Sequence, residues 1–227
     1  MRPTILRYDS LPSTNTEAAR QAMRGAAEGL CIVAAEQTAG RGRQARAWAS
    51  PKGAGLYFSI VLRPRLEQRA WPLLTLMCAC CVADALAEAC GLETDIKWPN
   101  DILAGGLKVC GILAETVETE LGRAVVIGIG INLKPGALPF ELRESATTVE
   151  EAAGRACEAE ELLRALTRAL ARRYEELHQP LGAELLLQAW TARSSYAEGL
   201  RVRVRLADEV LEGITRGLAS DGALRVE

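Results

Sequence analysis

The residues best suited to bind an anion lie in a short loop, QTAGRGRQARAW, at positions 37–48. Glycines let the backbone of such a loop approach a ligand closely, and an arginine makes forked hydrogen bonds to carboxylate or phosphate. This pattern indicates a small-molecule phosphate site, with a solvated basic loop and a nucleic-acid contact as open alternatives. The segment 37–66 has no acidic residue and six basic ones, Arg41, Arg43, Arg46, Lys52, Arg63 and Arg65.

A lysine in a predicted strand is the second candidate. The segment IKWPND, residues 96–101, places Lys97 in a strand pattern directly before a Trp-Pro-Asn-Asp turn. Because the chain has 4 lysines against 23 arginines, a lysine inside a strand is not explained by solubility. The alternative is that Lys97 reaches solvent from an edge strand.

Glycines interrupt two further strand patterns, AGGLKVCGILAE at 104–115 and VVIGIGINL at 125–133. Gly111, Gly128 and Gly130 weaken their strands, which suggests close approach of a ligand or of another backbone. Neither segment fits the P-loop or the dinucleotide fingerprint. ATP bound here would therefore use a different fold.

Residue counts argue against two kinds of site, a hydrolase site with a catalytic histidine and a structural zinc site. His178 is the only histidine, which argues against Ser-His-Asp and Cys-His hydrolases. The seven cysteines include a single C-x-x-C, within the run Cys78, Cys80 and Cys81, so a structural zinc site would lack ligands. The cysteines are expected to be small buried thiols in a reducing compartment.

The composition is that of a globular protein. The 227 residues are 49% hydrophobic and 25% charged, with a net charge of −2 that gives no argument for a polyanionic partner. The longest uncharged apolar stretch, Leu73 to Ala83, falls far short of the roughly 18 residues of a membrane span, and the N-terminus lacks a secretory pattern. A cytoplasmic protein without membrane contact is expected.

Residues 1–190 alternate strand and helix patterns, which predicts an α+β domain with a mixed sheet and flanking helices. Thr14 and Glu17 have the spacing of a capping box at the start of the first helix. The expected strands are Thr4–Tyr8, Leu30–Ala35, Gly55–Leu62, Thr94–Trp98, Leu107–Glu115 and Ala124–Leu133. The expected helices are 13–27, Trp71–Cys90, Ala159–Leu177 and Gly182–Thr191.

Residues 191–227 form a second, smaller unit. In RVRVRL, Arg201, Arg203 and Arg205 alternate with Val202, Val204 and Leu206, and short strands are expected at Val210–Ile214 and Ala223–Val226. This predicts a small antiparallel β module, too small to be stable alone.

Five motifs in order identify a resemblance to the biotin protein ligases, also called biotin–acetyl-CoA-carboxylase ligases. The resemblance covers about residues 4–150 and continues more weakly beyond. It implies a fold like that of class II synthetases and biotin/lipoate ligases, followed by an SH3-like module. The motifs are STN (13–15), QTAGRGR (37–43) with Trp48, KWPND (97–101), KxxGILxE (108–115) and GIGIN (128–132).

The resemblance implies a two-step reaction. Biotin and ATP first give biotinyl-5′-AMP, and a lysine of a biotin carboxyl carrier protein then displaces AMP. Biotin is a substrate, Mg²⁺ accompanies ATP, and no tightly bound prosthetic group is expected. No carboxylate can be named as a metal ligand from spacing.

The resemblance also assigns residues. Lys97 and Arg43 would be catalytic. The biotin-binding set would be Ser13, Thr14, Asn15, Gln37, Gly40, Arg41, Gly42, Arg43, Lys97 and Gly111. The ATP- and adenylate-binding set would be Arg43, Arg46, Trp48, Lys97, Asn100, Lys108 and Asn132.

The residue chemistry agrees with such a reaction. Joining a carboxylate to a triphosphate brings two anions together, so a fixed lysine and a forked arginine lower the barrier most where water is excluded. A carboxylate needs no general base, so the lack of a site histidine is no difficulty. The adenylate must be shielded from hydrolysis, and the loops 38–55 and 134–147 are expected to be mobile without ligand and to close over it.

Three departures from the family pattern stand out. Ala45 replaces the glycine of GRGRxGRxW, which is expected to restrict that position to ordinary backbone angles. The first motif begins at Ser13, so the resemblance is to monofunctional ligases without a DNA-binding domain. The C-terminal module looks truncated at Glu227.

Two other functions stay open at this stage. A lipoate or octanoate protein ligase or transferase shares the fold. A nucleic-acid-binding module would use the basic segment 41–65 and the arginines of 201–205, with binding that depends steeply on salt. An exposed sheet edge is compatible with a homodimer or with docking of the carrier by strand addition.

Overall fold

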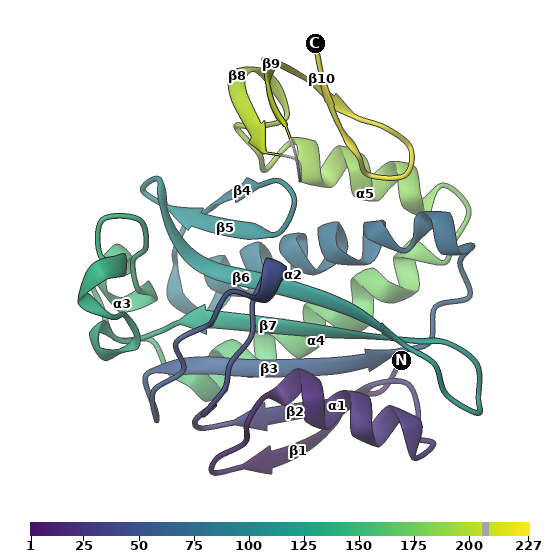
Figure 1. The fold of residues 1–227 in the computed structure, drawn as a ribbon, viewed down its shortest axis with the longest axis vertical. Coiled ribbons are helices and arrows are strands. Elements are labelled where there is room, and N and C mark those ends of the chain that lie inside the picture. The colour runs from purple at the N-terminus through teal and green to yellow at the C-terminus, as the bar shows by residue number, and fades with distance from the viewer. Residues whose placement is uncertain (206–208) are drawn as a thin grey trace.

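The computed structural model describes residues 1–205 and 209–227, which form two separate sheets, five α-helices and four short 3-10 helices (Figure 1). The helices are α1 (Thr14–Met23), α2 (Pro72–Cys90), α3 (Val149–Ala153), α4 (Ala159–Leu177) and α5 (Gly182–Thr191). The strands are β1 (Thr4–Tyr8), β2 (Leu30–Ala34), β3 (Gly55–Leu62), β4 (Asp95–Lys97), β5 (Asp101–Ala104), β6 (Leu107–Val117), β7 (Ala124–Asn132), β8 (Glu198–Arg205), β9 (Val210–Leu218) and β10 (Leu224–Val226).

The large sheet has the strand order β1-β2-β3-β7-β6-β5-β4. β1 pairs with β2 in parallel and the other neighbours are antiparallel, so the sheet is mixed, as predicted. β5 and α3 are additions that the pattern did not predict. β5 follows the Trp-Pro-Asn-Asp turn, where a four-residue strand leaves too few positions for an alternation to be recognised.

The two faces of this sheet are covered differently. Phe58, Ile60 and Leu62 of β3 belong to the main core, which α2 and α4 close. Val61, on the opposite face, packs with Ala18 and Ala22 of α1 in a smaller cluster. Because α1 covers only one end of that face, the rest is left to the loop 37–50 and to the candidate site.

α2 is the central core helix. Leu73, Leu76, Met77 and their neighbours are buried nearly all round, as the apolar pattern predicted. The helix segment Gln68–Cys90 is long and apolar enough to cross a membrane by length and composition, but 72% of its most apolar window is buried inside the molecule. This burial is that of a core helix.

The cysteines only partly follow the prediction. Cys31, Cys78, Cys80, Cys81 and Cys110 are buried free thiols, and burial raises the pKa of Cys80 to about 11. Cys90 and Cys157 instead form a disulfide, with Cα atoms 5.6 Å apart, so the expectation of free thiols throughout is wrong. Their separation of 67 residues gives no sequence signal, and only the fold brings the end of α2 beside the segment before α4.

The predicted capping box at α1 is also wrong. Ser13 is the N-cap and makes no side-chain cap bond. Glu17 accepts hydrogen bonds from Tyr8, Arg20 and Gln21, with Arg20 Nε at 2.7 Å, because the burial of Glu17 on the inner side of α1 demands partners. The helix ends at Met23 rather than near Ala27. A capping box is present instead at α3, between Thr148 and Glu151.

Glu17 predicts a pH dependence of stability. The hydrogen bond from Arg20 lowers the pKa of Glu17 to about 2 in the folded protein. Its contribution is therefore complete above the unfolded-state value near 4.5 and is lost as the pH falls toward 2. We expect Glu17→Gln to destabilise the protein at pH 7 and the difference from the parent to shrink between about pH 4.5 and 2. Urea unfolding at several pH values measures this, and a difference independent of pH would contradict it.

The small sheet consists of β8, β9 and β10, all antiparallel, in agreement with the predicted module. Leu206 lies outside the described residues. The indole Nε1 of Trp98 donates to the Gly222 carbonyl at 3.0 Å, which fixes the turn before β10 against the main body. The division of the chain at residues 190 and 191 stays a prediction.

Candidate active site

The floor of the site is the bare backbone of β6 and β7. Gly111 lies opposite Gly130 in the register. A Cβ on Gly130 would come within 2.5 Å of Trp48 Nε1, and one on Gly111 within 3.0 Å of the same indole ring. A Cβ on Gly128 would overlap Asn15 Oδ1. The expected close approach is therefore real, but the neighbours are the side chains of Asn15 and Trp48 rather than another backbone.

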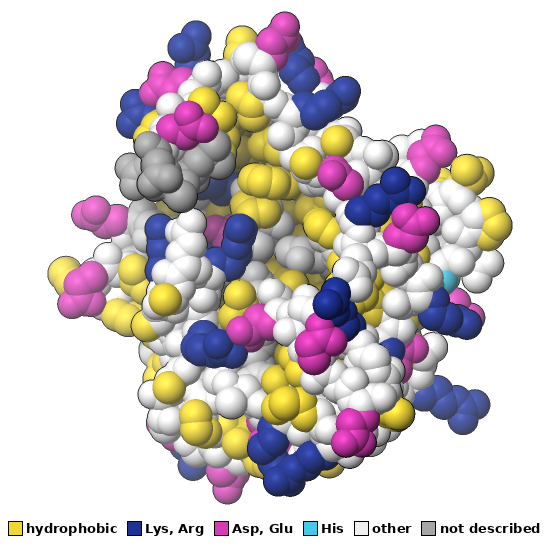
Figure 2. All heavy atoms as spheres, turned by 45° about the vertical axis from the view of Figure 1, so that its right-hand side comes forward, with side chains coloured by type: hydrophobic (Ala, Val, Ile, Leu, Met, Phe, Trp, Pro, Cys, Tyr) yellow, Lys and Arg dark blue, Asp and Glu magenta, His cyan; other side chains and the backbone are white. Residues whose placement is uncertain are grey.

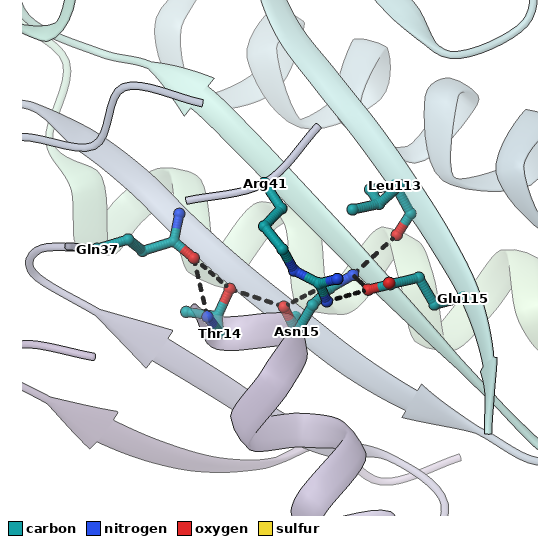
Figure 3. Close-up of polar contacts among 7 residues, drawn as sticks. Thr14, Asn15, Gln37, Arg41, Leu113 and Glu115 are labelled. Atoms are coloured by element: carbon teal, nitrogen blue, oxygen red, sulfur yellow. Dashed lines mark hydrogen bonds and ion pairs between the residues drawn. The ribbon is translucent and has the colours of Figure 1, made fainter. Parts of the chain in front are cut away.

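Asn15 is held in one orientation by its neighbours (Figure 3). Its Nδ2 donates to Glu115 Oε2 at 2.8 Å and to the Leu113 carbonyl at 3.3 Å. Its Oδ1 lies 2.6 Å from the hydroxyl of Ser59 on β3. Because donors and acceptors are matched on both sides, the amide cannot rotate without losing hydrogen bonds.

Thr14 and Gln37 continue this network toward the loop. Thr14 donates from both its backbone N and its hydroxyl to Gln37 Oε1, at 2.8 and 3.1 Å. Gln37 Nε2 donates in turn to Ser50 Oγ at 2.8 Å. These hydrogen bonds connect the start of α1 with both ends of the loop. Ser13 is buried beside them.

The loop 37–50 is closed on itself. Gln37 N donates to the Ser50 carbonyl and Trp48 N to the Gly40 carbonyl, at 3.1 and 2.9 Å. A Cβ on Gly40 would overlap the Trp48 carbonyl, so Gly40 serves the closure of the loop. From this loop, Arg41 forms an ion pair with Glu115 on β6, as Figure 3 shows, with its Nη2 2.7 Å from Glu115 Oε2.

At the tip of the loop, Gln44 and Ala45 have φ values of 55° and 57°. The expectation that Ala45 keeps ordinary backbone angles is therefore wrong: this alanine adopts the left-handed region that glycine enters without penalty. The tight turn between Arg41 and Ala47, which pair as an antiparallel bridge, requires it.

Ala45→Gly is expected to stabilise the protein by about 1 kcal/mol, since glycine removes the steric cost of a positive φ. The matched control is Ala47→Gly, which lies in the same loop outside the set of positive-φ residues. There glycine only adds flexibility to the unfolded chain and should lower stability. Urea unfolding of both variants measures the two changes in the free energy of unfolding, which should have opposite signs. A loss of stability in Ala45→Gly would contradict the argument.

The other end of the site is cationic. Arg43 Nη1 donates to Asn100 Oδ1 at 3.2 Å. Lys108 Nζ lies 2.6 Å from Asp101 Oδ1 and 5.3 Å from the centre of the Trp48 ring. Anionic groups of a ligand would find these donors already gathered.

Lys97 ends β4, the last strand of the large sheet, and its side chain is exposed. Its Nζ lies 5.6 Å from the centre of the Tyr196 ring, in the segment that leads to β8. Lys97 is thus on an edge strand, as the alternative interpretation had it, yet it also lines the cavity.

One cavity of about 900 Å³ joins these parts. Every residue of the predicted binding sets lines it except Gly40, which lies just behind Trp48. Arg43 and Lys97 share this cavity. Asn132 lines its far end, where its Nδ2 donates to the Thr147 carbonyl at 3.3 Å and Leu138 and Leu142 add apolar surface.

Sequence reasoning missed several residues of the site. Glu115 and Asp101 stand in the quoted motifs, but their roles as partners of Asn15, Arg41 and Lys108 depend on the fold. Tyr196, Arg201 and Arg203 line the cavity from the C-terminal segment. No local pattern marks Tyr196, and the alternating pattern marked the two arginines only for the nucleic-acid alternative.

The basic segment 41–65 does not form one surface. Arg63 is half-buried and donates to the Ala22 and Ala26 carbonyls, so it fastens the end of α1. β3, in the middle of the segment, is mostly buried. The segment therefore offers no continuous basic surface, and the nucleic-acid alternative stays a prediction.

Comparisons with known proteins agree on one family. The model of the biotin/lipoate A/B protein ligase family matches residues 8–132. The bifunctional ligase/repressor BirA of Bacillus subtilis is 37% identical over 98% of this chain and 69% of its own length. The biotin–acetyl-CoA-carboxylase ligase of Paracoccus denitrificans is 37% identical over 93% of this chain and 89% of its own. Among solved structures, the biotin protein ligase of Aquifex aeolicus in complex with biotin and ATP superposes with a TM-score of 0.86, at 27% identity over 98% of this chain and 91% of that one.

Proposed function

The chain belongs to the biotin/lipoate A/B protein ligase family, and from this premise we propose that it is a biotin protein ligase. It activates biotin with ATP as biotinyl-5′-AMP and transfers the biotinyl group to a protein lysine. The observation that carries this function is the single cavity with a neutral, hydrogen-bonding end at Asn15 and a cationic end at Arg43 and Lys108. The curated relatives favour biotin over lipoate.

The neutral end suits the head group of biotin. A ureido ring presents one carbonyl acceptor and two N–H donors, and Thr14, Asn15 and Gln37 carry hydroxyl and amide groups able to match both kinds. Ser59 and Glu115 hold the Asn15 amide in place, so its orientation is set before a ligand arrives. The indole of Trp48, packed over Gly130, supplies an apolar wall for the ring and chain of biotin.

The cationic end suits the reacting groups. Arg43, Lys97 and Lys108 would reduce the repulsion between the biotin carboxylate and the α-phosphate as the carboxylate attacks, and would stabilise the charge that builds up on that phosphate. Arg46 and Asn100 lie beside them in the cavity. Asn132 and the loop after it would hold the nucleoside part.

Mg²⁺ would enter with ATP. In the described part of the chain no three His, Cys, Asp or Glu residues form a metal cluster, which fits an ion held mainly by phosphates and water. Asp101 is the one carboxylate among the described residues that line the cavity. When Lys108 leaves Asp101 to pair with an anionic group of the substrate, the Asp101 carboxylate would be free to bind the ion. The ion would neutralise part of the charge of the phosphates.

The acceptor would be a lysine of the biotin carboxyl carrier protein of a carboxylase, as the family implies. A cytoplasmic location follows for an enzyme that serves such carriers.

The function is tested by biotin-dependent exchange of pyrophosphate into ATP, repeated with lipoate. We expect exchange with biotin only. Exchange with lipoate alone would support the related lipoate ligases. A gel shift with DNA at two salt concentrations tests the nucleic-acid alternative, for which we expect no complex.

The loops 38–55 and 134–147 are predicted to close over the adenylate. Biotin plus ATP should therefore protect both from limited proteolysis, since a closed loop cannot enter a protease site. Mass spectrometry of the fragments locates the cuts. Equal cleavage with and without substrates would count against closure.

A further inference from the structure

A second cavity, of about 390 Å³, adjoins the first. It lies between the first turn of α2, the far half of β6 and the turn before β10. Both cavities are lined by Arg43, Trp98, Pro99, Asn100 and Ile112, so these residues form a common wall. Figure 2 shows the molecule hollowed below the C-terminal strands, with hydrophobic side chains in the floor and Lys and Arg side chains at the margin.

The walls of the second cavity are mostly apolar. Leu76 and Ile112 are buried, and Ala114 and Ala223 expose their methyl groups. Trp98 is fixed by its hydrogen bond to Gly222, so this wall is preformed. Asp221 is exposed at the outer end, and its Oδ1 accepts from the Ala223 backbone at 3.0 Å. Arg43 is the only cation among the described lining residues.

A lysine side chain suits this arrangement as it passes inward with its ammonium group leading. Its four methylenes are apolar, as the walls are, and its ammonium group carries the charge opposite to that of Asp221. With the adenylate in the first cavity, an amine must reach the acyl carbon from an adjoining space. Positive charge at Arg43 disfavours an ammonium ion there, so the amine would meet the adenylate in its neutral, nucleophilic form.

Building on the function proposed above, we propose that the second cavity is the entry for the acceptor lysine. Asp221 attracts the ammonium group at the outer end, where the ammonium gives one proton to water. The apolar walls then guide the neutral amine and its stem toward the common wall. The nitrogen lone pair forms a bond with the carboxyl carbon of biotin. The bond from that carbon to the phosphate oxygen breaks with its electron pair, AMP leaves, and the nitrogen gives up one proton to the leaving phosphate or to water.

Filling the cavity tests the proposal. Ala114→Phe adds an aromatic ring to a wall residue that does not line the first cavity. Thr116→Phe is the matched control, because Thr116 is exposed on the same face of β6, one position beyond the lining. Two steps are measured separately: biotin-dependent pyrophosphate exchange, and single-turnover transfer from preformed biotinyl-5′-AMP to a carrier domain and to N-acetyl-lysine methylamide.

We expect Ala114→Phe to slow transfer to both acceptors about tenfold to a hundredfold, with exchange within about twofold of the parent and Thr116→Phe near the parent in both steps. Intact exchange also shows that the variant folds. Transfer within twofold of the parent would overturn the proposal, and so would equal losses in transfer and exchange. Slow transfer to the carrier alone would also overturn it, because docking rather than the lysine channel would then be blocked.

The charge at the outer end gives a second readout. Asp221→Lys should raise the KM for the carrier about fivefold at low salt and less at high salt, as expected for one exposed charge pair. Asp221→Asn, which keeps the turn hydrogen bond, should give a smaller increase. No change in either variant would remove Asp221 from the proposal. A parent enzyme without exchange activity would refute the ligase function itself, which keeps the two failures apart.

Discussion

Arg43→Ala and Lys97→Ala are each expected to slow the formation of biotinyl-5′-AMP about a hundred- to a thousandfold, the usual loss for one electrostatic donor once the proposed loop closure excludes water from the site. Both side chains line the cavity that would hold the biotin carboxylate and the α-phosphate. Neither substitution removes a buried contact, because both residues are exposed, so the fold should survive. Pyrophosphate exchange and the unfolding free energy measure the two effects.

The matched control is Lys52→Ala, since Lys52 is exposed in the same basic segment but does not line the cavity. It should exchange pyrophosphate at the parent rate. The structure adds Lys108→Ala as a comparison, because Lys108 lies deeper in the site, between Asp101 and Trp48. Rates within a few-fold of the parent for both Arg43→Ala and Lys97→Ala would show the assignment of roles to be wrong.

Gly128→Ala is expected to weaken biotin binding about tenfold to a hundredfold. The new methyl group would overlap Asn15 Oδ1, so Asn15 must move away from Ser59 and Glu115. Displacing a hydrogen-bonded amide in a half-closed site costs about 1–3 kcal/mol, which corresponds to this loss of affinity. Titration calorimetry with biotin measures it directly.

Gly136→Ala serves as the control for Gly128→Ala. A Cβ at Gly136 meets no atom within 4 Å, and its φ is not in the left-handed region. Biotin binding should stay at the parent level. Equal affinities for the two variants would mean that the contact between Asn15 and Gly128 does not shape the pocket.

The local parts of this fold could be predicted from the sequence. The buried run of α2 and the glycine-bearing strands β6 and β7 produce strong patterns, and the structure contains them nearly as expected. Short elements such as β5 and α3 are exceptions, because too few residues contribute to a period. Thr14 and Glu17 show how a capping pattern loses to tertiary contacts: Gln37 and Arg20 offer these side chains better-placed partners.

The candidate site was predictable as a set of residues but not as a set of contacts. Nearly all the side chains that the motifs assigned to the site line the cavity. They did not reveal that Glu115 links Asn15 to Arg41 across about a hundred residues of sequence, because such pairs exist only after β6 is placed beside α1. The positive φ of Ala45 was hidden for a related reason: the closure of the whole loop imposes it.

The acid and amide partners of the site's cations have a consequence for selectivity. Arg41, Arg43 and Lys108 are engaged by Glu115, Asn100 and Asp101 respectively before any substrate is present. An entering anion must therefore displace these partners from the cations, because no unpaired positive charge waits for it among these three residues. Each exchange costs about 1 kcal/mol or less at such partly exposed pairs. A molecule with several anionic groups and its own divalent counterion forms several new ion pairs, which together offset the cost of these exchanges. Inorganic phosphate, which is abundant in any cell, offsets only one exchange and therefore binds weakly.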